Sequence, residues 1–341
     1  PLYINFTSGS TGSPKGVVVS HRSVMDFIPQ FVEVMKITKD DKIGNQAPFD
    51  FDVSVKDIYS AIYTGATVVL IPREYFSKPV CLMDYLCDRK ISILIWAVSA
   101  LCFITTMKGL EYRCPTEIKC IGFSGEVMPI KHFNKLKKYL TKTKFINLYG
   151  PTEITCNCTY YSIPEEVTYS LQDTIPIGKN FVNEKVFLLD ENDNLINPKN
   201  RSLIGEICVA GTCLALGYYN DEERTNKVFV QNPLQDKYRE IIYRTGDMAQ
   251  YVADGNLRYI SRKDFQVKHL GHRIELGEIE SITMQIDNVD RAICMYQLEK
   301  KRIVLFYTGK CEKKAIQEIL HESLPTYMIP NKIIKLEMMP L

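Results

Sequence analysis

The first part of the chain alternates short apolar runs with segments of helical periodicity. Some runs, such as residues 91–97, are almost continuously apolar, which is typical of strands buried on both faces of a parallel sheet. The pattern predicts strands at 2–6, 16–20, 67–71, 91–97, 120–123 and 145–148, and helices at 21–35, 55–63, 82–89 and 131–140. Ser23 is expected to cap the first helix and Gly65 to end the second. Residues 1–162 are therefore expected to form a parallel α/β subdomain.

The pattern of apolar and polar residues changes after residue 163. Short β-rich runs at 185–190, 204–210, 249–252 and 257–260 are separated by polar turns, which predicts a small, barrel-like antiparallel β subdomain over 163–263. From residue 265 the order is strand, helix (276–285), strand (291–298), strand (302–308) and helix (313–320). Residues 264–341 are therefore expected to form a separate, mobile α+β domain.

The composition and net charge argue against some classes of binding partner. The net charge is +2, 45% of the residues are hydrophobic and 24% are charged, so neither a nucleic-acid nor a membrane partner is expected. The 11 cysteines show no metal-ligand spacing, which favours free thiols in a reducing cytoplasm. No apolar run approaches the roughly 18 residues of a membrane helix. The sequence starts inside one apolar run and stops after another, so we expect it to be a fragment.

The strongest chemical signal is the loop Thr-Ser-Gly-Ser-Thr-Gly-Ser-Pro-Lys-Gly at residues 7–16. Its three glycines let the backbone approach an anion closely, and its hydroxyls and Lys15 supply donors and a positive charge, which suits a polyphosphate. A flexible linker is the structural alternative. The pattern of a Walker loop fails, because Lys15 lies between a proline and a glycine, and this disfavours a P-loop kinase or ATPase.

Five further segments follow in order, and with them the loop resembles the adenylate-forming superfamily of acyl-CoA synthetases, luciferases and peptide-synthetase adenylation domains. They are Asn-Leu-Tyr-Gly-Pro-Thr-Glu at 147–153, the glycine motif at 205–218, Tyr-Arg-Thr-Gly-Asp at 243–247, the segment 262–280 and Leu-Pro-Thr-Tyr-Met-Ile-Pro at 324–330. The resemblance spans nearly the whole chain. It implies an AMP-forming ligase that uses ATP and Mg²⁺.

The resemblance also implies roles for individual residues. Tyr149 is expected to stack on adenine, Asp247 to accept the ribose hydroxyls and Glu153 to bind Mg²⁺. Thr152, Glu153 and Lys15 are the expected catalytic residues. The expected nucleotide contacts are Thr7, Ser8, Gly9, Ser10, Thr11, Gly12, Lys15, Gly125, Glu126, Asn147, Tyr149, Gly150, Thr152, Asp247, Tyr259 and Arg262. Two structural alternatives stay open: Asp247 as the cap of its own turn, and Glu153 as the partner of a helix N-cap.

Two further expectations concern the end of the chain. By the resemblance, Asp264 is the hinge about which the last domain rotates between adenylation and thioester formation, with an ordinary surface aspartate as the alternative. The family's catalytic lysine belongs to an Asn-Gly-Lys motif beyond residue 341, so the fragment alone is not expected to be fully active.

The acid to be activated is expected to be an amino acid. Asp52 resembles the aspartate that pairs with a substrate α-ammonium group, although backbone donors alone are an alternative partner for it. By the same resemblance the pocket is lined by Asp52, Val53, Lys56, Ile95, Gly122, Ser124, Leu148, Cys156 and Asn157. Lys56 has three possible arrangements: it pairs with an acidic substrate, pairs with Asp57 or Glu126, or turns away. Segments 51–59, 95–96 and 124–129 instead resemble D-alanine–carrier protein ligase, which implies a small substrate.

The expected function is therefore amino-acid activation followed by transfer to the phosphopantetheine thiol of a carrier protein. The alternatives within the same fold are an acyl-CoA synthetase and a D-alanine–carrier protein ligase. A non-catalytic nucleotide-binding module is the alternative from another class.

Overall fold

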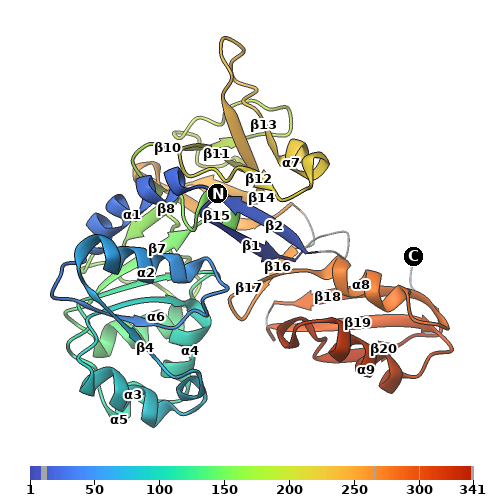
Figure 1. Cartoon of the computed structure of the whole chain (residues 1–341), viewed down its shortest axis with the longest axis horizontal. Helices are drawn as coiled ribbons and strands as arrows, with labels where there is room; N and C mark the ends of the chain where they lie inside the picture. Colours follow the sequence, from blue (N-terminus) through green and yellow to red (C-terminus); the bar gives the residue numbers. More distant parts are fainter. Residues whose placement is uncertain (9–13, 264–265, 299, 339–341) are drawn as a thin grey trace. The chain divides into compact units, whose positions relative to one another are not determined.

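A computed structural model describes residues 1–8, 14–263, 266–298 and 300–338, apart from the side chain of residue 273 (Figure 1). The chain divides into two compact units. Unit 1 comprises Pro1–Asn5 and Val17–Lys263, and unit 2 comprises Phe6–Gly16 and Asp264–Leu341. Among the described residues, no helix is long and apolar enough to cross a membrane.

A seven-stranded sheet forms the centre of the first part of unit 1 (Figure 1). Its strand order is β4-β3-β5-β6-β7-β8-β9, in which the first five strands are parallel and the last two antiparallel. These strands are β3 (Lys42–Asn45), β4 (Thr67–Leu70), β5 (Ile93–Ala97), β6 (Cys120–Ser124), β7 (Lys144–Tyr149), β8 (Thr159–Ser162) and β9 (Lys179–Asn180). The apolar run in β5 is continuous because both faces are covered: Ile93 and Ile95 belong to one core, and Leu94 and Trp96 to the other.

Helices supply the other half of each core. Helices α1 (His21–Met35) and α2 (Val53–Thr64) pack with Ile93 and Ile95. The second core holds α3 (Pro79–Asp88), α4 (Val98–Thr106), α5 (Gly109–Tyr112) and α6 (Ile130–Tyr139). The cap of α1 is Ser20 rather than the predicted Ser23, because the helix begins at His21 and the Ser23 amide donates to Ser20 Oγ at 3.0 Å. Gly65 ends α2 with a φ of +78°, as predicted.

The second part of unit 1 is an antiparallel sheet. It is built from β10 (Glu184–Leu189), β11 (Ile204–Gly211), β13 (Phe229–Gln231), β14 (Ile241–Tyr251) and β15 (Leu257–Arg262), with α7 (Glu222–Val228) beside it. In a separate three-stranded sheet, β12 (Gly217–Tyr218) pairs with β2 (Lys15–Val19), which neighbours β1 (Tyr3–Thr7). Strand β14 is longer than the predicted run 249–252, and its additional residues carry the Tyr-Arg-Thr-Gly-Asp motif.

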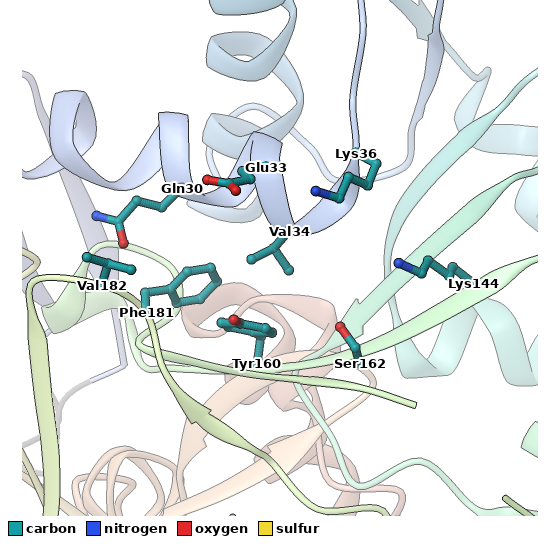
Figure 2. Close-up of a pocket in the computed structure, with 9 residues that line it drawn as sticks. All are labelled: Gln30, Glu33, Val34, Lys36, Lys144, Tyr160, Ser162, Phe181 and Val182. Atoms are coloured by element: carbon teal, nitrogen blue, oxygen red, sulfur yellow. The ribbon is translucent and has the colours of Figure 1, made fainter. Parts of the chain in front are cut away.

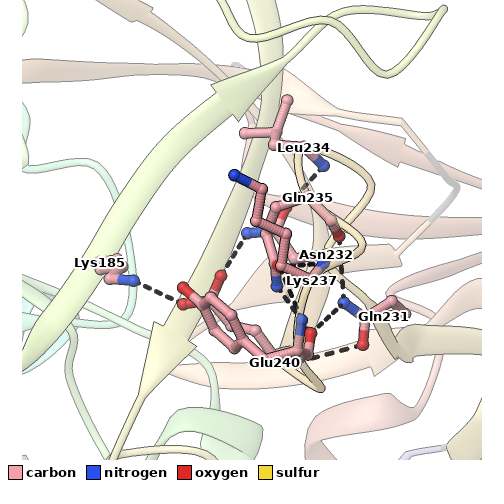
Figure 3. Close-up of polar contacts among 8 residues, drawn as sticks. Lys185, Gln231, Asn232, Leu234, Gln235, Lys237 and Glu240 are labelled. Atoms are coloured by element: carbon pink, nitrogen blue, oxygen red, sulfur yellow. Dashed lines mark hydrogen bonds and ion pairs between the residues drawn. The ribbon is translucent and has the colours of Figure 1, made fainter.

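Polar contacts brace the loop that leads from β13 into β14 (Figure 3). Asn232 donates from Nδ2 to Glu240 Oε2 at 2.7 Å, and Lys185 pairs with the other oxygen of Glu240 at 2.5 Å. The side-chain oxygen of Gln235 accepts from the amides of Lys237 and Tyr238 at 3.1 and 3.2 Å. The loop therefore has a defined conformation where it enters the strand that carries Asp247.

Unit 2 has a core of its own around Ile303, Leu305 and Tyr307. A hairpin of β16 (Gln266–His269) and β17 (His272–Glu275) precedes α8 (Leu276–Met284). The sheet of β18 (Val289–Gln297), β19 (Arg302–Gly309) and β20 (Lys332–Lys335) packs with α9 (Lys313–Ser323). The order from residue 266 follows the predicted α+β pattern, with β17 and β20 added.

Candidate active site

The carboxyl ends of adjacent parallel strands carry several of the predicted site residues. Strand β6 ends at Ser124 and is followed by Gly125, whose φ of +95° lies in the region that favours glycine. Strand β7 ends at Tyr149 and leads into Gly150 and a short 3-10 turn at Thr152–Ile154. A Cβ atom on Gly150 would lie 2.5 Å from Asn157 Cα, so only glycine fits there. Open α/β sheets bind their ligands at this edge.

Tyr149, Asp247 and Arg262 form one buried polar group. The Tyr149 hydroxyl donates to Asp247 Oδ2 at 2.6 Å, and Arg262 Nη1 pairs with Asp247 Oδ1 at 2.8 Å. Only 4% of Tyr149 and 1% of Asp247 is exposed. Burial, reinforced by the charge of Asp247, raises the pKa of Tyr149 well above its usual value, so the phenol remains a donor.

Asp247 does not cap its own turn. The amide of Asp247 donates to Thr245 Oγ1 at 3.0 Å, and the amide of Gly246 donates to Glu206 Oε1 at 3.1 Å. The turn is thus held by Thr245 and Glu206, and the Asp247 carboxylate points to partners outside it. Both of its oxygens keep acceptor capacity for further donors.

Glu153 lies fully buried in the turn after β7. Its Oε1 accepts from the Tyr218 hydroxyl at 2.8 Å, and its backbone oxygen accepts from the amide of Ala215 at 2.9 Å. The N-cap of this turn is Pro151, which has no side-chain acceptor, so Glu153 is not the partner of a helix N-cap. A buried carboxylate offers the kind of oxygen ligand that magnesium takes. No group of three or more His, Cys, Asp or Glu side chains suited to a metal occurs among the described residues.

Asp52 is the N-cap residue that precedes α2, and it is half-buried. Burial raises the pKa of its carboxyl, whereas a hydrogen bond from Thr152, the charge of Lys56 and the amide of Val53 oppose that rise. The Asp52 carboxylate therefore interacts with side chains as well as with backbone donors. The Cys156 thiol donates to the backbone oxygen of Asp52 at 3.1 Å, which ties the start of α2 to the turn after β7.

Lys56 lies one helical turn beyond Asp52, and only 1% of it is exposed. Its ammonium donates to Asn157 Oδ1 at 2.8 Å, and it forms no ion pair with a described residue. Of the arrangements considered from the sequence, direct pairing with Asp57 or Glu126 is therefore wrong, and the other two stay predictions. Burial lowers the pKa of Lys56, and the nearby Cys156, Asp52 and Asp57 oppose that change.

A second group of predicted pocket residues is apolar. Ile95 and Gly122 are paired across β5 and β6. A Cβ atom on Gly122 would lie 3.0 Å from both Leu148 Cδ1 and Met35 Sδ, so these side chains adjoin it. Val53 is half-buried, and Ser124 is buried at the end of β6. The turn that holds Cys156 has positive φ at two non-glycine residues, Thr155 (+51°) and Cys156 (+72°), which is a strained conformation.

Some predicted residues are placed elsewhere or serve the fold. Gly9, Ser10, Thr11, Gly12 and Asp264 lie outside the described residues. Thr7, Ser8 and Lys15 belong to unit 2, and their role at the phosphates stays a prediction.

Asn147 donates from Nδ2 to the backbone oxygen of Pro176 at 2.8 Å and so braces β7. Glu126 and Tyr259 are half-buried. Tyr218 lies in the glycine motif at 205–218, but its contact with Glu153 was not predicted from the sequence.

A cavity of about 280 Å³ lies away from these residues (Figure 2). It includes Lys144, where β7 starts, and Ser162, where β8 ends, so it opens at the opposite edge of the sheet. None of the predicted site residues lines it.

The chain is similar to several curated proteins. Bacitracin synthase 1 of Bacillus licheniformis is 37% identical over 349 residues, covering 99% of this chain and 6% of its own length. Zwittermicin A synthase ZmaJ of Bacillus cereus is 34% identical, covering 100% of this chain and 65% of its own. The chain thus spans less than two thirds of either relative.

A solved structure also matches the fold. The structure of holo-PA1221, described as an NRPS protein containing adenylation and PCP domains bound to a vinylsulfonamide inhibitor, matches with a TM-score of 0.85 and 27% identity. The match covers 99% of this chain and 57% of that one. The family described as AMP-binding enzyme matches residues 1–219. This chain belongs to the family of AMP-binding enzymes.

Proposed function

We propose that the protein activates an amino acid with ATP as an aminoacyl-adenylate and passes the aminoacyl group to the phosphopantetheine thiol of a carrier protein. This proposal is based mainly on the groups that surround Asp52. Its carboxylate lies at the start of α2 beside Thr152 and Lys56, next to the turn that holds Glu153.

The nucleotide part of the proposal rests on Tyr149, Asp247 and Arg262. Asp247 accepts one bond at each oxygen and retains lone pairs for two ribose hydroxyls. The hydroxyl of Tyr149 is engaged with Asp247, so its ring is fixed at the end of β7 as a surface for adenine. ATP bound there would supply the adenylyl group, with the loop at 7–16 as the proposed phosphate cradle.

Glu153 is the proposed ligand of Mg²⁺. Magnesium commonly takes one or two carboxylates together with phosphate oxygens, so one buried carboxylate fits this cation without a cluster of ligands. The hydrogen bond from Tyr218 holds one oxygen in place. Magnesium bound there would offset negative charge on the phosphates.

Asp52 favours an amino acid over a simple carboxylic acid. Burial disfavours its ionised form, and an α-ammonium group placed beside it would restore the ionised form by pairing with it. A fatty acid offers no such partner, so binding one would leave the Asp52 carboxylate without an ammonium group of the substrate to pair with. This argument disfavours an acyl-CoA synthetase.

The carrier-protein step and the domain arrangement complete the proposal. A PCP domain accompanies the adenylation domain in PA1221, and this supports a carrier partner here. We infer three parts, at 1–162, 163–263 and 264–341, with the last rotating about Asp264. The break between the two units after Lys263 supports that hinge.

The test uses Asp52→Ala in the full-length protein, with pyrophosphate release measured for amino acids and for their analogues that lack the amino group. We expect the wild type to discriminate strongly in favour of the amino group, and the variant to lose activity with amino acids while its ATP affinity is preserved. A variant that activates amino acids as well as the wild type does would overturn the assignment of Asp52. The acyl-CoA synthetase alternative predicts activity with the analogues in both proteins.

A further inference from the structure

The segment of β14 that carries Asp247 is a bulge in the antiparallel sheet. Between the cross-strand pairs Cys208–Arg244 and Glu206–Met248, strand β11 has one residue and strand β14 has three. The extra residues of β14 leave the regular ladder, so their backbone amides need acceptors from elsewhere. Bulges re-aim side chains, and Asp247 is the last residue of this one.

Glu206 supplies an acceptor at the centre of this bulge. Its Oε1 accepts from the amide of Gly246 at 3.1 Å, and its Oε2 pairs with Arg244 Nη1 at 3.2 Å. Lys263 Nζ lies 3.8 Å from the same Oε2, in a more exposed and therefore weaker pair. Only 7% of Glu206 is exposed, so water does not readily replace it. A buried carboxylate that accepts from an amide and a guanidinium group is a strong anchor.

Gly246 connects this anchor to the end of unit 1. Its amide is bonded to Glu206, its φ of +71° favours glycine, and its carbonyl accepts from the amide of Lys263 at 2.8 Å. Lys263 is the last residue of unit 1. Thr245 braces the same bulge, since its Oγ1 donates to the carbonyl of Ile207 at 2.8 Å. The bulge is therefore held from β11 and in turn holds the end of the unit.

Neutralising Arg244 does not account for Glu206. The guanidinium of Arg244 also pairs with Asp193, so it has a second counter-charge. The amide of Gly246, by contrast, has Glu206 as its acceptor. The specific task of the Glu206 carboxylate is therefore at the bulge.

The side chain of Asp247 is held by Tyr149 and Arg262, whereas its backbone is held by the bulge. Resting on the proposed function, in which Asp247 accepts the ribose hydroxyls, we propose that Glu206 is a positioning residue for the nucleotide. Through the amide of Gly246 it fixes the bulge that presents Asp247, and the end of unit 1 rests on the same bulge. A carboxylate that is displaced from its place binds its ligand more weakly, because hydrogen bonds depend steeply on distance and angle.

Glu206→Gln in the full-length protein tests the anchor. The carboxamide keeps the size of the side chain but turns one acceptor oxygen into a donor, so either Gly246 or Arg244 loses its acceptor. We expect amide hydrogen exchange in peptides that cover residues 243–248 and 258–263 to become about tenfold faster. Exchange as slow as in the wild type would contradict the anchor, whether or not the protein binds a nucleotide.

Glu240→Gln is the matched control. Glu240 pairs with Lys185 and accepts from the amide group of Asn232, so the same substitution removes comparable contacts in the same sheet, beside another loop (Figure 3). We expect this variant to leave exchange at 243–248 and 258–263 unchanged. Faster exchange there in both variants would show a general loosening of the sheet and would overturn the specific role of Glu206.

Nucleotide titration tests the positioning role. AMP is compared with 2′,3′-dideoxy-AMP, which lacks both ribose hydroxyls. We expect the wild type and Glu240→Gln to bind AMP about tenfold or more tightly, and Glu206→Gln to lose at least about threefold of that preference. An undiminished preference in Glu206→Gln overturns the inference and leaves the proposed function intact. A wild type that binds the two nucleotides equally overturns the ribose assignment in the proposed function itself.

Glu206→Asp provides a second variant. It keeps the negative charge but draws the carboxylate back from Gly246 by about 1.5 Å, the length of one carbon–carbon bond. We expect the same faster exchange and the same loss of preference for AMP. If Glu206→Gln fails to fold, Glu206→Asp decides, and wild-type behaviour of Glu206→Asp in both measurements overturns the inference.

Discussion

The phenol of Tyr149 donates a 2.6 Å hydrogen bond to the carboxylate of Asp247, 98 residues later in the chain. Tyr149 ends β7 of the mixed α/β sheet, and Asp247 lies in β14 of the antiparallel sheet. Two motifs that the sequence links only by family resemblance are therefore joined by a direct contact inside unit 1. Removing this contact should weaken both the fold and the nucleotide site.

Tyr149→Phe removes only the donor. A hydrogen bond to a charged acceptor contributes about 1.5–3 kcal/mol, so we expect the free energy of unfolding to fall by roughly that amount and ATP to bind several-fold more weakly. Urea unfolding and nucleotide titration measure the two effects. Tyr63→Phe, at an exposed position on α2, is the matched control and should change neither. Equal behaviour of both variants would show that the contact is not formed.

Asp247→Asn breaks the buried ion pair between Asp247 and Arg262. Losing one partner of such a pair costs about 3 kcal/mol, so the variant should unfold at clearly lower denaturant concentration and bind ATP weakly. Asp84→Asn makes the same chemical change at an exposed pair with Arg113, where less than about 1 kcal/mol is expected. Similar losses in the two variants would contradict the burial of Asp247.

Glu153→Gln keeps an oxygen that can accept from Tyr218 but removes the negative charge. We expect the fold to be preserved and the Mg²⁺ concentration for half-maximal pyrophosphate exchange to rise about tenfold or more, since Mg²⁺ prefers carboxylate oxygens. Tyr218→Phe should produce a smaller rise, because the carboxylate remains but loses its orienting donor. A magnesium dependence like that of the wild type in Glu153→Gln would exclude Glu153 as the ligand.

The free energy of unfolding should depend on pH through the protonation of Glu184. Its Oε1 accepts from the Cys213 amide at 3.0 Å, its Oε2 has no hydrogen-bond partner among the described residues, and burial raises its pKa to about 7. The folded state therefore holds this proton more tightly than the unfolded chain does. Its contribution to stability is complete below the unfolded pKa, near 4.5, and is lost as the pH rises through about 7.

Glu184→Gln should remove that dependence. We expect the variant to be more stable than the wild type at pH 8, by about 1–2 kcal/mol, and close to it at pH 5. Chemical unfolding at both pH values measures the difference, with the exposed Glu191→Gln as the control. A variant whose stability follows pH as the wild type does would contradict the raised pKa.

Apolar runs predicted the strands at the centre of the sheet well and the elements with mixed patterns poorly. Strand β5 was found because both of its faces are covered, which makes its sequence continuously apolar. Strand β3 was missed because Ile43 is the single large apolar residue in Lys42–Asn45. Only the end of β14 was predicted, because its inward positions include the polar Thr245 and Asp247, which hide the alternation. Helix α4 follows β5 directly and is also rich in apolar residues, so the sequence showed no clear boundary between the two elements.

The candidate site, too, could be predicted from the sequence only in part. Asp52, Glu153 and Asp247 lie in segments whose residue types carry a family pattern, so they could be named from the sequence. The partners of these residues could not be named, because Tyr218 reaches Glu153 across 65 residues and Tyr149 reaches Asp247 across 98 residues. Contacts between distant segments depend on packing, which no local pattern records.

Amino-acid-dependent ATP–pyrophosphate exchange by the full-length protein measures amino-acid activation itself. We expect exchange that requires an amino acid and Mg²⁺, and that is lost in Asp52→Ala while ATP still binds. Exchange with no amino acid, or exchange that persists undiminished in Asp52→Ala, would contradict it.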